Sequence, residues 1–272
     1  MSKESSSVRF LYNTAVGRFF LKALVNPRFS RIAGAFLDSR LSKPMVGRFI
    51  KKNNINMGDY EERRYKSFND FFTRKRKQID FDKDLSSLIS PCDGFLTAFK
   101  VDEDSRFTIK NSTYSLAELL NDKELADSYK DGMCLIFRLT PRHFHRYSFI
   151  DSGVVKGEKV IPGILHCVRP VACDRYPVYV QNSREYTVIE TDNFGTVVQM
   201  EVGAIIVGKI TNHQGLDKVE RCQEKGYFEF GGSTIIALLK KDVASVDEAI
   251  LKNSADDIET EVKIGQRIAT TV

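Results

Sequence analysis

The sequence has no tryptophan and only seven prolines among its 272 residues. Cysteine is scarce too: the five cysteines are scattered and never form a Cys-x-x-Cys pair. An odd number of unclustered cysteines argues against a disulfide scaffold and predicts reduced thiols, which are typical of the cytosol. With 42% hydrophobic and 28% charged residues, the composition also excludes a disordered or collagen-like chain. We therefore expect one large globular domain, or one domain with an appendage.

Long apolar runs are missing as well. No stretch approaches the roughly 18 to 20 uncharged apolar residues that a membrane span requires. The first ten residues, MSKESSSVRF, lack the apolar core of a secretory signal. These two absences predict a protein that is made and kept inside the cell.

Positive charge is concentrated at one end of the chain. The net charge is +5, yet residues 1–52 carry 11 Lys and Arg against two acids, a balance of +9. The remaining residues hold 30 basic and 34 acidic side chains, a balance of −4. The excess favours an anionic membrane surface as a partner, and no recognisable motif accompanies it that would favour nucleic acid.

The basic N-terminal part has helical spacing. Apolar residues recur every three to four positions over residues 8–25, and Asn26-Pro27 is expected to end that helix. Further helices are predicted near 28–41 and after Pro44. Two interpretations stay open: a helical cap packed on a core, or a basic amphipathic surface lying on an anionic membrane.

The rest of the chain is predicted to be β-rich. SFNDFFTRKRK (67–77) predicts a short helix with buried phenylalanines, followed by an exposed basic turn. From about residue 88, short runs of β-branched and aromatic residues alternate with Gly, Asp and Asn. One helix is predicted at 115–127, a hairpin turn at 193–195 and a closing strand and turn at 261–268. The predicted strands are 134–140, 178–181, 185–191, 196–202, 204–210 and 233–239.

These elements predict an α+β fold, with N-terminal basic amphipathic helices followed by a β-rich domain, where any catalytic residues are to be sought. We place a helical, membrane-associating region at 1–66 and the β-rich domain at 67–272. The sequence contains no internal repeat and no low-complexity linker that would mark a sharper boundary.

Histidines are the first candidates for chemistry. His143 and His145 lie two positions apart on a strand-like segment, 138–149, and such a pair points to one face, as zinc ligands can. His166, with Cys167 beside it, would supply a further ligand. The spacing matches no zinc signature. The alternative for each histidine is a partly buried, hydrogen-bonded side chain.

Two turns contain the other candidate groups. In FEFGGSTIIALL (228–239), the glycines before Ser233 serve either a turn into a buried strand or a strained Gly232–Ser233 peptide beside a nucleophilic hydroxyl. In SPCDG (90–94), Asp93 is either an ordinary turn residue or the acid that fixes the tautomer of a histidine base.

The order of these motifs resembles a known family. SFNDFFTRK, then Pro-x-Asp-Gly, then Pro-Arg-x-x-His-Arg, then Gly-Ser-Thr is similar to phosphatidylserine decarboxylase, a pyruvoyl-dependent proenzyme. The resemblance extends from about residue 67 to residue 239, and SREYTVIETDNFGTVVQMEVGAIIVGKI (183–210) resembles the central strands of that family.

This resemblance implies a chain that cuts itself between Gly232 and Ser233. The implied catalytic triad consists of Asp93, His145 and Ser233. The products would be a β-chain of residues 1–232 and an α-chain of residues 233–272, which stay together. Ser233 would become a covalent pyruvoyl group, whose Schiff base with the substrate amine withdraws electrons as CO2 leaves. The resemblance implies neither a metal nor a diffusible cofactor.

The implied reaction converts phosphatidylserine to phosphatidylethanolamine and CO2. The basic N-terminus would then hold the enzyme as a peripheral protein on the cytoplasmic face of the cell membrane. Two other classes stay open. One is a non-cleaving, membrane-binding β-domain. The other is a zinc-dependent hydrolase that uses His143, His145 and His166.

The chain departs from the family pattern near these residues. Many members read His-Arg-x-His where this chain has HRYS (145–148), so His145 is the only histidine on the matched motif. His143 stands where the family often has Asp, which makes it a spare candidate for the base. Gly231 replaces a leucine beside the implied cut.

Overall fold

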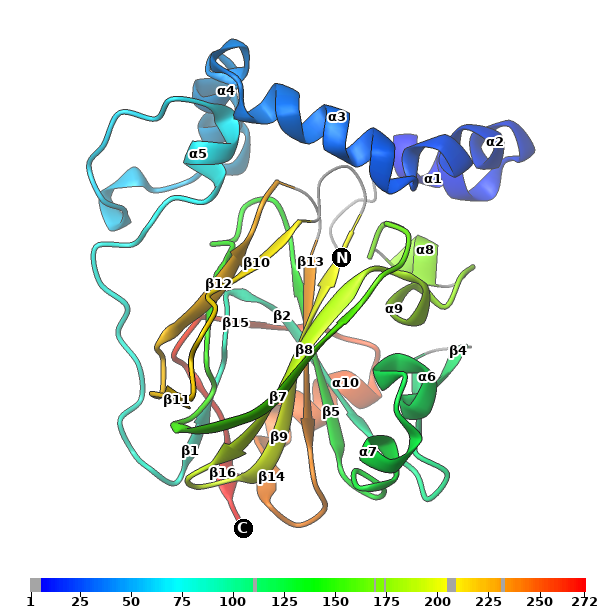
Figure 1. Ribbon diagram of the computed structural model, residues 1–272, viewed down its shortest axis with the longest axis vertical. Helices are drawn as coiled ribbons and strands as arrows, with labels where there is room; N and C mark the ends of the chain where they lie inside the picture. Colours follow the sequence, from blue (N-terminus) through cyan, green and yellow to red (C-terminus); the bar gives the residue numbers. More distant parts are fainter. Residues whose placement is uncertain (1–5, 110–111, 169, 174, 205–208, 231–232) are drawn as a thin grey trace.

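Helices occupy the N-terminal part of the protein and strands dominate from Ser87 onward, which confirms the predicted α+β class (Figure 1). Among the residues described, no helix is long and apolar enough to cross a membrane. The computed structural model describes residues 6–109, 112–168, 170–173, 175–204, 209–230 and 233–272.

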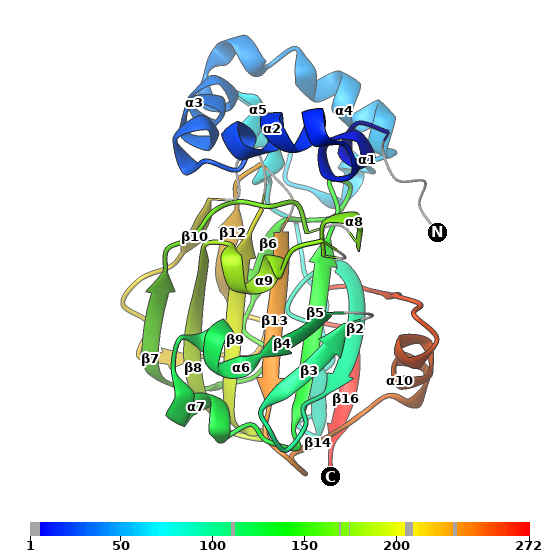
Figure 2. The ribbon, with the colours of Figure 1, turned by 90° about the vertical axis from the view of Figure 1, so that its right-hand side faces the viewer.

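The N-terminal helices lie across one end of the β-rich part (Figures 1 and 2). They are α1 (Ser6–Asn13), α2 (Ala15–Leu24), α3 (Pro27–Asp38), α4 (Met45–Asn53) and α5 (Phe68–Phe72), with short 3-10 helices at Arg40–Ser42 and Met57–Asp59. We call α1 to α4 the helical cap. Pro27 is the first residue of α3, where a missing N–H costs nothing, so the predicted boundary at Asn26-Pro27 is confirmed.

The single helix predicted over residues 8–25 is wrong, because the chain breaks at Thr14. The Thr14 hydroxyl accepts the N–H of Gly17 at 2.9 Å and donates to the carbonyl of Phe10 at 2.9 Å. A Cβ on Gly17 would lie 2.1 Å from that carbonyl oxygen, so glycine is needed where α2 turns back on α1. Periodicity missed the break because the apolar spacing continues across it.

The helical cap is docked on the β-rich part through Tyr12. Its side chain is fully buried, and its hydroxyl accepts the N–H of Cys167 at 2.8 Å and contacts Nδ1 of His166 at 3.2 Å. The cap nevertheless exposes large apolar side chains: Phe10, Val16, Phe19, Phe20, Phe29, Ile32, Phe36 and Leu41. Both interpretations of these helices therefore have structural support.

Antiparallel strands form a central sheet with β13 in its interior. The strands are β2 (Gly94–Lys100), β5 (Met133–Leu139), β7 (Gly153–Ile161), β8 (Arg184–Thr191), β9 (Gly195–Gly203), β11 (Lys218–Val219), β13 (Ser233–Leu239) and β15 (Thr260–Val262). Their order is β11-β7-β8-β9-β13-β5-β2-β15. β13 pairs with β5 on one side and β9 on the other, and β8 and β9 form the predicted hairpin.

Smaller sheets flank the central one. Their strands are β1 (Ser87–Ile89), β16 (Arg267–Thr271) and β14 (Ala244–Val246), then β10 (Ile210–Asn212), β12 (Glu224–Phe228) and β6 (Arg146–Ser148), then β3 (Arg106–Ile109) and β4 (Ser112–Ser115). Tyr147 of β6 and Phe228 of β12 pack in one core with Leu139 and Ile235 of the central sheet. The β10-β12-β6 sheet therefore covers one face of β13 and β5.

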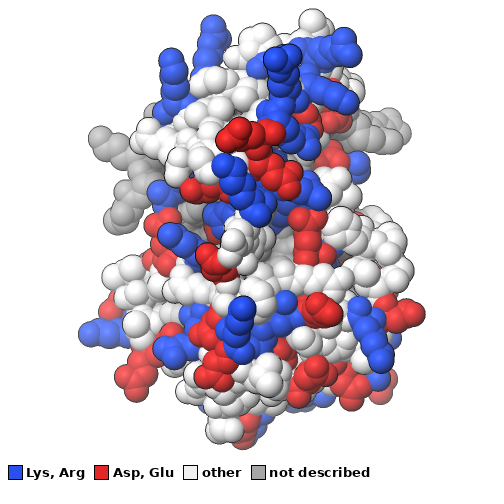
Figure 3. Space-filling view, turned by 90° about the vertical axis from the view of Figure 1, so that its left-hand side faces the viewer, with Lys and Arg blue, Asp and Glu red and all other residues white. Residues whose placement is uncertain are grey.

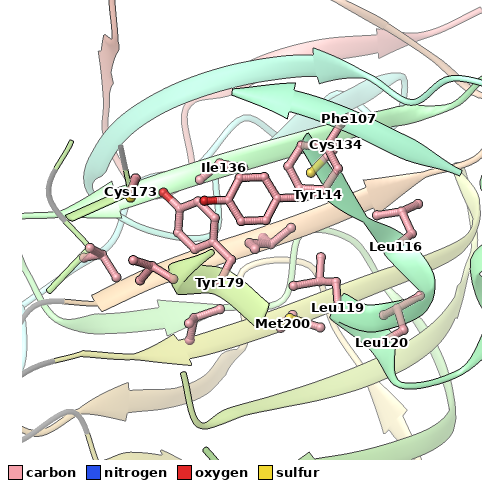
Figure 4. Packing of buried hydrophobic residues seen from close by; sticks show 14 of the residues in the cluster. Phe107, Tyr114, Leu116, Leu119, Leu120, Cys134, Ile136, Cys173, Tyr179 and Met200 are labelled. Atoms are coloured by element: carbon pink, nitrogen blue, oxygen red, sulfur yellow. The ribbon is translucent and has the colours of Figure 1, made fainter. Parts of the chain in front are cut away.

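The opposite face of the central sheet is covered by short helices. They are α6 (Leu116–Leu120), α7 (Lys123–Asp127), α8 (Pro170–Cys173) and α9 (Val178–Gln181), while α10 (Glu248–Ala255) packs beside β2. Tyr114 and Tyr179 lie with their rings 5.4 Å apart in this second core, next to Ile136 of β5 (Figure 4). Because alternate residues of β13 enter the two cores, the strand is buried along its whole length.

Several predicted elements differ from the structure. The predicted strand 178–181 is helix α9, because the N–H groups of Val180 and Gln181 both donate to the carbonyl of Pro177. The helix predicted at 115–127 is split into α6 and α7, because Asn121 adopts a positive φ of 47° and ends α6. The predicted strand 204–210 falls largely outside the described residues.

The segment 138–149 is not one strand. β5 ends at Leu139, and the N–H of His143 donates to the carbonyl of Thr140 at 2.9 Å, which closes a turn around Pro141. His143 and His145 therefore lie in the loop between β5 and β6 rather than on one face of a strand.

The segment 67–77 is partly as predicted. It forms α5, with Phe68, Phe71 and Phe72 buried, and Ser67 caps the helix by accepting a backbone N–H. The basic turn that follows is not exposed throughout, because the side chain of Arg74 is fully buried.

Candidate active site

Ser233 lies at the first position of β13, at the end of the central sheet that faces the helical cap (Figures 1 and 2). It pairs with Leu139 on β5 and with Gly203 on β9, and its side chain is fully buried. Strand alternation places it on the face of Ile235, beneath the β10-β12-β6 sheet. The candidate nucleophile therefore faces the layer between two sheets.

Among the described residues, this layer contains buried polar atoms that have no hydrogen-bond partner. Oγ of Ser233 and Nε2 of His145 are both buried and unpaired. Oε1 of Gln199 and Oε1 of Glu201 on β9 are unpaired on the same face, while Oγ1 of Thr234 is unpaired on the opposite face of β13. Most buried polar groups in folded proteins find a partner. Unpaired atoms on a hydroxyl and on an imidazole at the cap-facing end of the sheet therefore indicate a functional site.

The imidazole of His145 is fixed from its other side. Nδ1 lies 2.9 Å from the carbonyl oxygen of His143, and the ring centroid lies 4.1 Å from that of Phe72. Burial moves the pKa of His145 well below its ordinary value, and the nearby positive charge of Arg74 lowers it further. A carbonyl can only accept, so Nδ1 carries the proton and Nε2 holds the free lone pair. His145 is thus a neutral base.

A backbone hydrogen bond and aromatic contacts connect His145 to the segment that precedes Ser233. The backbone carbonyl of His145 accepts the N–H of Phe228 at 2.9 Å, at the end of β12. The ring of Phe72 contacts His145 and also lies 5.0 Å from Phe230, three residues before Ser233. Residues 231 and 232, which include the Gly232 side of the implied cut, lie outside the described residues.

Asp93 lies at the same end of the central sheet but bonds elsewhere. Its carboxylate binds the guanidinium of Arg76 through two contacts, at 2.6 and 3.2 Å, and accepts the N–H of Ile264 at 3.0 Å. The structure does not join Asp93 directly to His145. Gly94, the neighbour of Asp93, lies on β2, and Ser233 lies on β13, with β5 between these strands. The strand pairing therefore separates Gly94 from Ser233 by about 10 Å.

The other histidines are held differently, although Nε2 of His143 is also buried without a hydrogen-bond partner among the described residues. Nδ1 of His143 accepts the N–H of Thr140 at 3.0 Å, and burial lowers the pKa of His143 to about 4, against an opposing effect of Asp93. Nδ1 of His166 contacts the hydroxyl of Tyr12 on α1. In the part of the chain that is described, no three His, Cys, Asp or Glu side chains are grouped as metal ligands. The structure therefore does not assemble a zinc site from these histidines.

Sequence reasoning missed three buried charged side chains near the site. Arg74 stands in a run of basic residues that normally indicates an exposed turn. Glu201 and Lys225 form an ion pair of 2.6 Å that is almost completely buried, and strand alternation places Glu201 on the same face as Ser233. No pattern in the sequence separates these charges from exposed ones.

Comparisons with known proteins agree with this site. A sequence model of the phosphatidylserine decarboxylase family matches residues 68–270. Phosphatidylserine decarboxylase proenzyme 2 of Clostridium acetobutylicum is 48% identical over 271 residues, which cover 98% of this chain and 93% of the relative. Phosphatidylserine decarboxylase proenzymes of Ruminiclostridium cellulolyticum and Clostridium perfringens are 40% and 38% identical, over 96% of this chain and 90% and 92% of theirs.

These similarities define the class: the protein is an enzyme, a decarboxylase of phospholipid biosynthesis. The chain belongs to the phosphatidylserine decarboxylase family. The family resemblance inferred from four short motifs is thereby confirmed.

Proposed function

We propose that the chain is a self-processing decarboxylase that cuts itself before Ser233 and converts phosphatidylserine to phosphatidylethanolamine and CO2. One observation carries the self-processing part of the proposal. Oγ of Ser233 and Nε2 of His145 are buried at the same end of the fold and have no hydrogen-bond partner among the described residues, one being a hydroxyl and the other a neutral base. Each supplies what the other needs for nucleophilic attack.

The cut follows from ordinary acid–base chemistry. Nε2 of His145 takes the hydroxyl proton of Ser233, and the oxygen attacks the carbonyl carbon of Gly232. The peptide C–N bond breaks and an ester replaces it. The proton held by His145 passes to the freed amine of residue 233. Loss of the Cα proton of Ser233 then expels the Gly232 carboxylate and leaves dehydroalanine, which takes up water and releases ammonia to give the pyruvoyl group. Residues 1–232 and 233–272 stay associated, because β13 is paired on both sides within the central sheet.

We assign Asp93 a positioning role in this reaction. Its carboxylate holds Arg76 and the N–H of Ile264, which fixes the turn that precedes β2. The carbonyl of Pro91 in the same turn accepts the N–H of Ser148, three residues after His145. Asp93 would therefore act on the base through this turn rather than by direct contact.

The surroundings of Ser233 suit the pyruvoyl group that such a cut leaves. This group supplies a carbonyl that withdraws electrons during decarboxylation. The position is buried, its cross-strand neighbour Gly203 has no side chain, and His145 lies at the same end of the fold to hold or return a proton.

We further propose that the helical cap holds the enzyme on an anionic membrane, at the cytoplasmic face. Phe19, Ile32 and Leu41 are 74%, 73% and 78% exposed on the cap. Lys and Arg side chains stand out from this end of the molecule (Figure 3), in line with the balance of +9 in residues 1–52. Apolar insertion and attraction to anionic lipid would act together.

A denaturing gel with mass spectrometry tests the self-processing step. We expect two chains, the smaller one beginning at residue 233 with a pyruvoyl group. One intact chain after prolonged native incubation would favour the non-cleaving, membrane-binding alternative. One intact chain with bound zinc would favour the hydrolase alternative.

A further inference from the structure

Arg74 is a fully buried cation whose donors are mostly unused. Its guanidinium carbon lies 4.3 Å from the ring centroid of Tyr60 and 4.9 Å from that of Phe71. Nη2 donates to the Tyr60 hydroxyl at 3.2 Å, and Nη1 donates to the carbonyl of Phe72 at 3.4 Å. Nε is buried and has no hydrogen-bond partner among the described residues. A guanidinium has five N–H groups, so two neutral acceptors leave most of them free.

The described residues provide no counter-charge for Arg74. Other buried cations of this protein are paired or saturated: Lys225 with Glu201 at 2.6 Å, and Arg221 with Asp151 at 2.8 Å. Arg184 donates to several backbone carbonyls. Around Arg74, no described carboxylate lies within 4.0 Å. A buried charge is costly unless something pairs with it. Its presence therefore calls for an anion that comes from outside the described chain.

The position of Arg74 indicates where that anion would lie. Phe72, whose carbonyl binds Arg74, also places its ring 4.1 Å from the ring of His145. The carbonyl of Thr73 accepts Nε of Arg146 at 2.8 Å, so the two segments run side by side. The charge of Arg74 is felt at His145, where it lowers the pKa. An anion bound to Arg74 would lie beside the proposed base.

We propose that Arg74 holds an anionic group of the substrate head group, its carboxylate or its phosphate, beside His145. The proposal rests on the proposed function. A serine phospholipid brings an amine and two anions, and a planar guanidinium binds either anion through two parallel hydrogen bonds. The Tyr60 and Phe71 rings hold the guanidinium in place before the ligand arrives.

The test compares processed wild-type enzyme with Arg74→Met and Arg74→Lys. Two soluble amines serve as competitive inhibitors: O-methylserine, which has the carboxylate, and glycerophosphoethanolamine, which has the phosphate. We expect Arg74→Met to weaken one of them by about tenfold to a hundredfold and to leave the other unchanged. The weakened inhibitor identifies the anion. Arg74→Lys keeps the charge and should lose less.

Arg63→Met is the matched control. Arg63 lies eleven residues before Arg74 in the same segment, is half exposed and pairs with Asp70. This variant should bind both inhibitors like the wild type. Equal inhibition of Arg74→Met and wild type by both amines would overturn the proposal for Arg74 while leaving the decarboxylase intact. An uncut, inactive wild type would instead contradict the proposed function.

A second measurement covers the case in which Arg74→Met does not cut itself. Ser233→Ala removes the nucleophile and leaves the chain whole, so thermal unfolding can report binding without any covalent step. Glycerophosphoserine should raise the melting temperature of Ser233→Ala and fail to raise that of Ser233→Ala/Arg74→Met. The same shift in both variants, or no shift in either, would overturn the assignment.

Discussion

Nδ1 of His145 donates to the carbonyl oxygen of His143, 2.9 Å away. In a serine-type triad, an acid normally orients the histidine and fixes its tautomer. Here the orienting group is the backbone carbonyl of His143, two residues before His145, and Asp93 is bound to Arg76 instead. The tautomer of His145 is therefore fixed by the local fold of the loop.

This contact predicts which histidine the cut needs. Replacing His145 by Ala should slow the release of the smaller chain at least about 100-fold, because the base is lost. His143→Ala should cut much like the wild type, since the orienting group is the His143 backbone. His213→Ala is the control, because that side chain lies exposed beside Glu224. Loss of the cut in His143→Ala, with a normal rate in His145→Ala, would reverse the assignment.

The buried histidines predict a pH dependence of stability. Burial lowers the pKa of His145 well below 6.5 and that of His143 to about 4. Between pH 6.5 and about 4 the unfolded chain binds these protons and the folded chain does not. The free energy of unfolding should therefore fall with decreasing pH, by about 1.4 kcal/mol per unit for each histidine. Urea midpoints at pH 7 and 5 measure this, and His143→Gln should reduce the slope.

We expect Asp93→Asn to lower both the stability of the fold and the rate of self-cleavage. The amide cannot pair with Arg76 as the carboxylate does, so we expect a loss of about 1.5–3 kcal/mol in the free energy of unfolding. The cut should slow because the turn before β2 shifts. Asp131→Asn breaks an exposed pair with Lys241 and serves as control. A cut of normal rate in a destabilised Asp93→Asn would show that Asp93 only stabilises the fold.

Much of the fold around the candidate site could be predicted from the sequence, because turn residues and apolar runs mark its strands. The hairpin at 193–195 and the buried strand from Ser233 follow from turn residues and apolar runs, and both are confirmed. Helix breaks at Thr14 and Asn121 could not be foreseen, since they depend on a cap and on one left-handed residue within otherwise helical patterns. What the sequence does not predict is which residues of distant segments contact one another.

The buried charges show this gap most clearly. Lys225 lies in a charged stretch and Glu201 in an apolar run, and neither context predicts that they meet. The contact exists because β12 crosses the face of β9, which is a property of the topology rather than of either segment. Asp93 is a similar case: its motif is visible in the sequence, yet nothing in that motif predicts that its partner is Arg76.

The Glu201–Lys225 pair predicts a non-additive effect on stability. Lys225→Met leaves the Glu201 charge buried without its partner and should cost about 3–5 kcal/mol in the free energy of unfolding. Glu201→Leu combined with Lys225→Met removes both charges and should recover most of that loss. Urea unfolding of the single and double variants measures the difference. Additive losses in the double variant would show that the two charges act independently.

The helical cap predicts how the protein binds membranes. Because Tyr12 docks α1 on the β-rich part, deleting the first helices would disturb the fold, and single substitutions are the cleaner test. Phe19→Ser and Leu41→Ser should weaken flotation with anionic vesicles, since both side chains are largely exposed on the cap. Leu85→Ser removes a side chain of similar exposure, 67%, outside the cap and should bind normally.

Salt separates the two contributions to this binding. The screening length falls from about 10 Å at 0.1 M to about 3 Å at 1 M, so the attraction of residues 1–52 to anionic lipid should weaken. Insertion of apolar side chains is not screened and should leave a residual binding that Phe19→Ser removes. Equal flotation on neutral and anionic vesicles, or no effect of either cap substitution, would make the cap a packing element only. The assignment of Ser233 and His145 would survive that result, because it depends on the β-rich part alone.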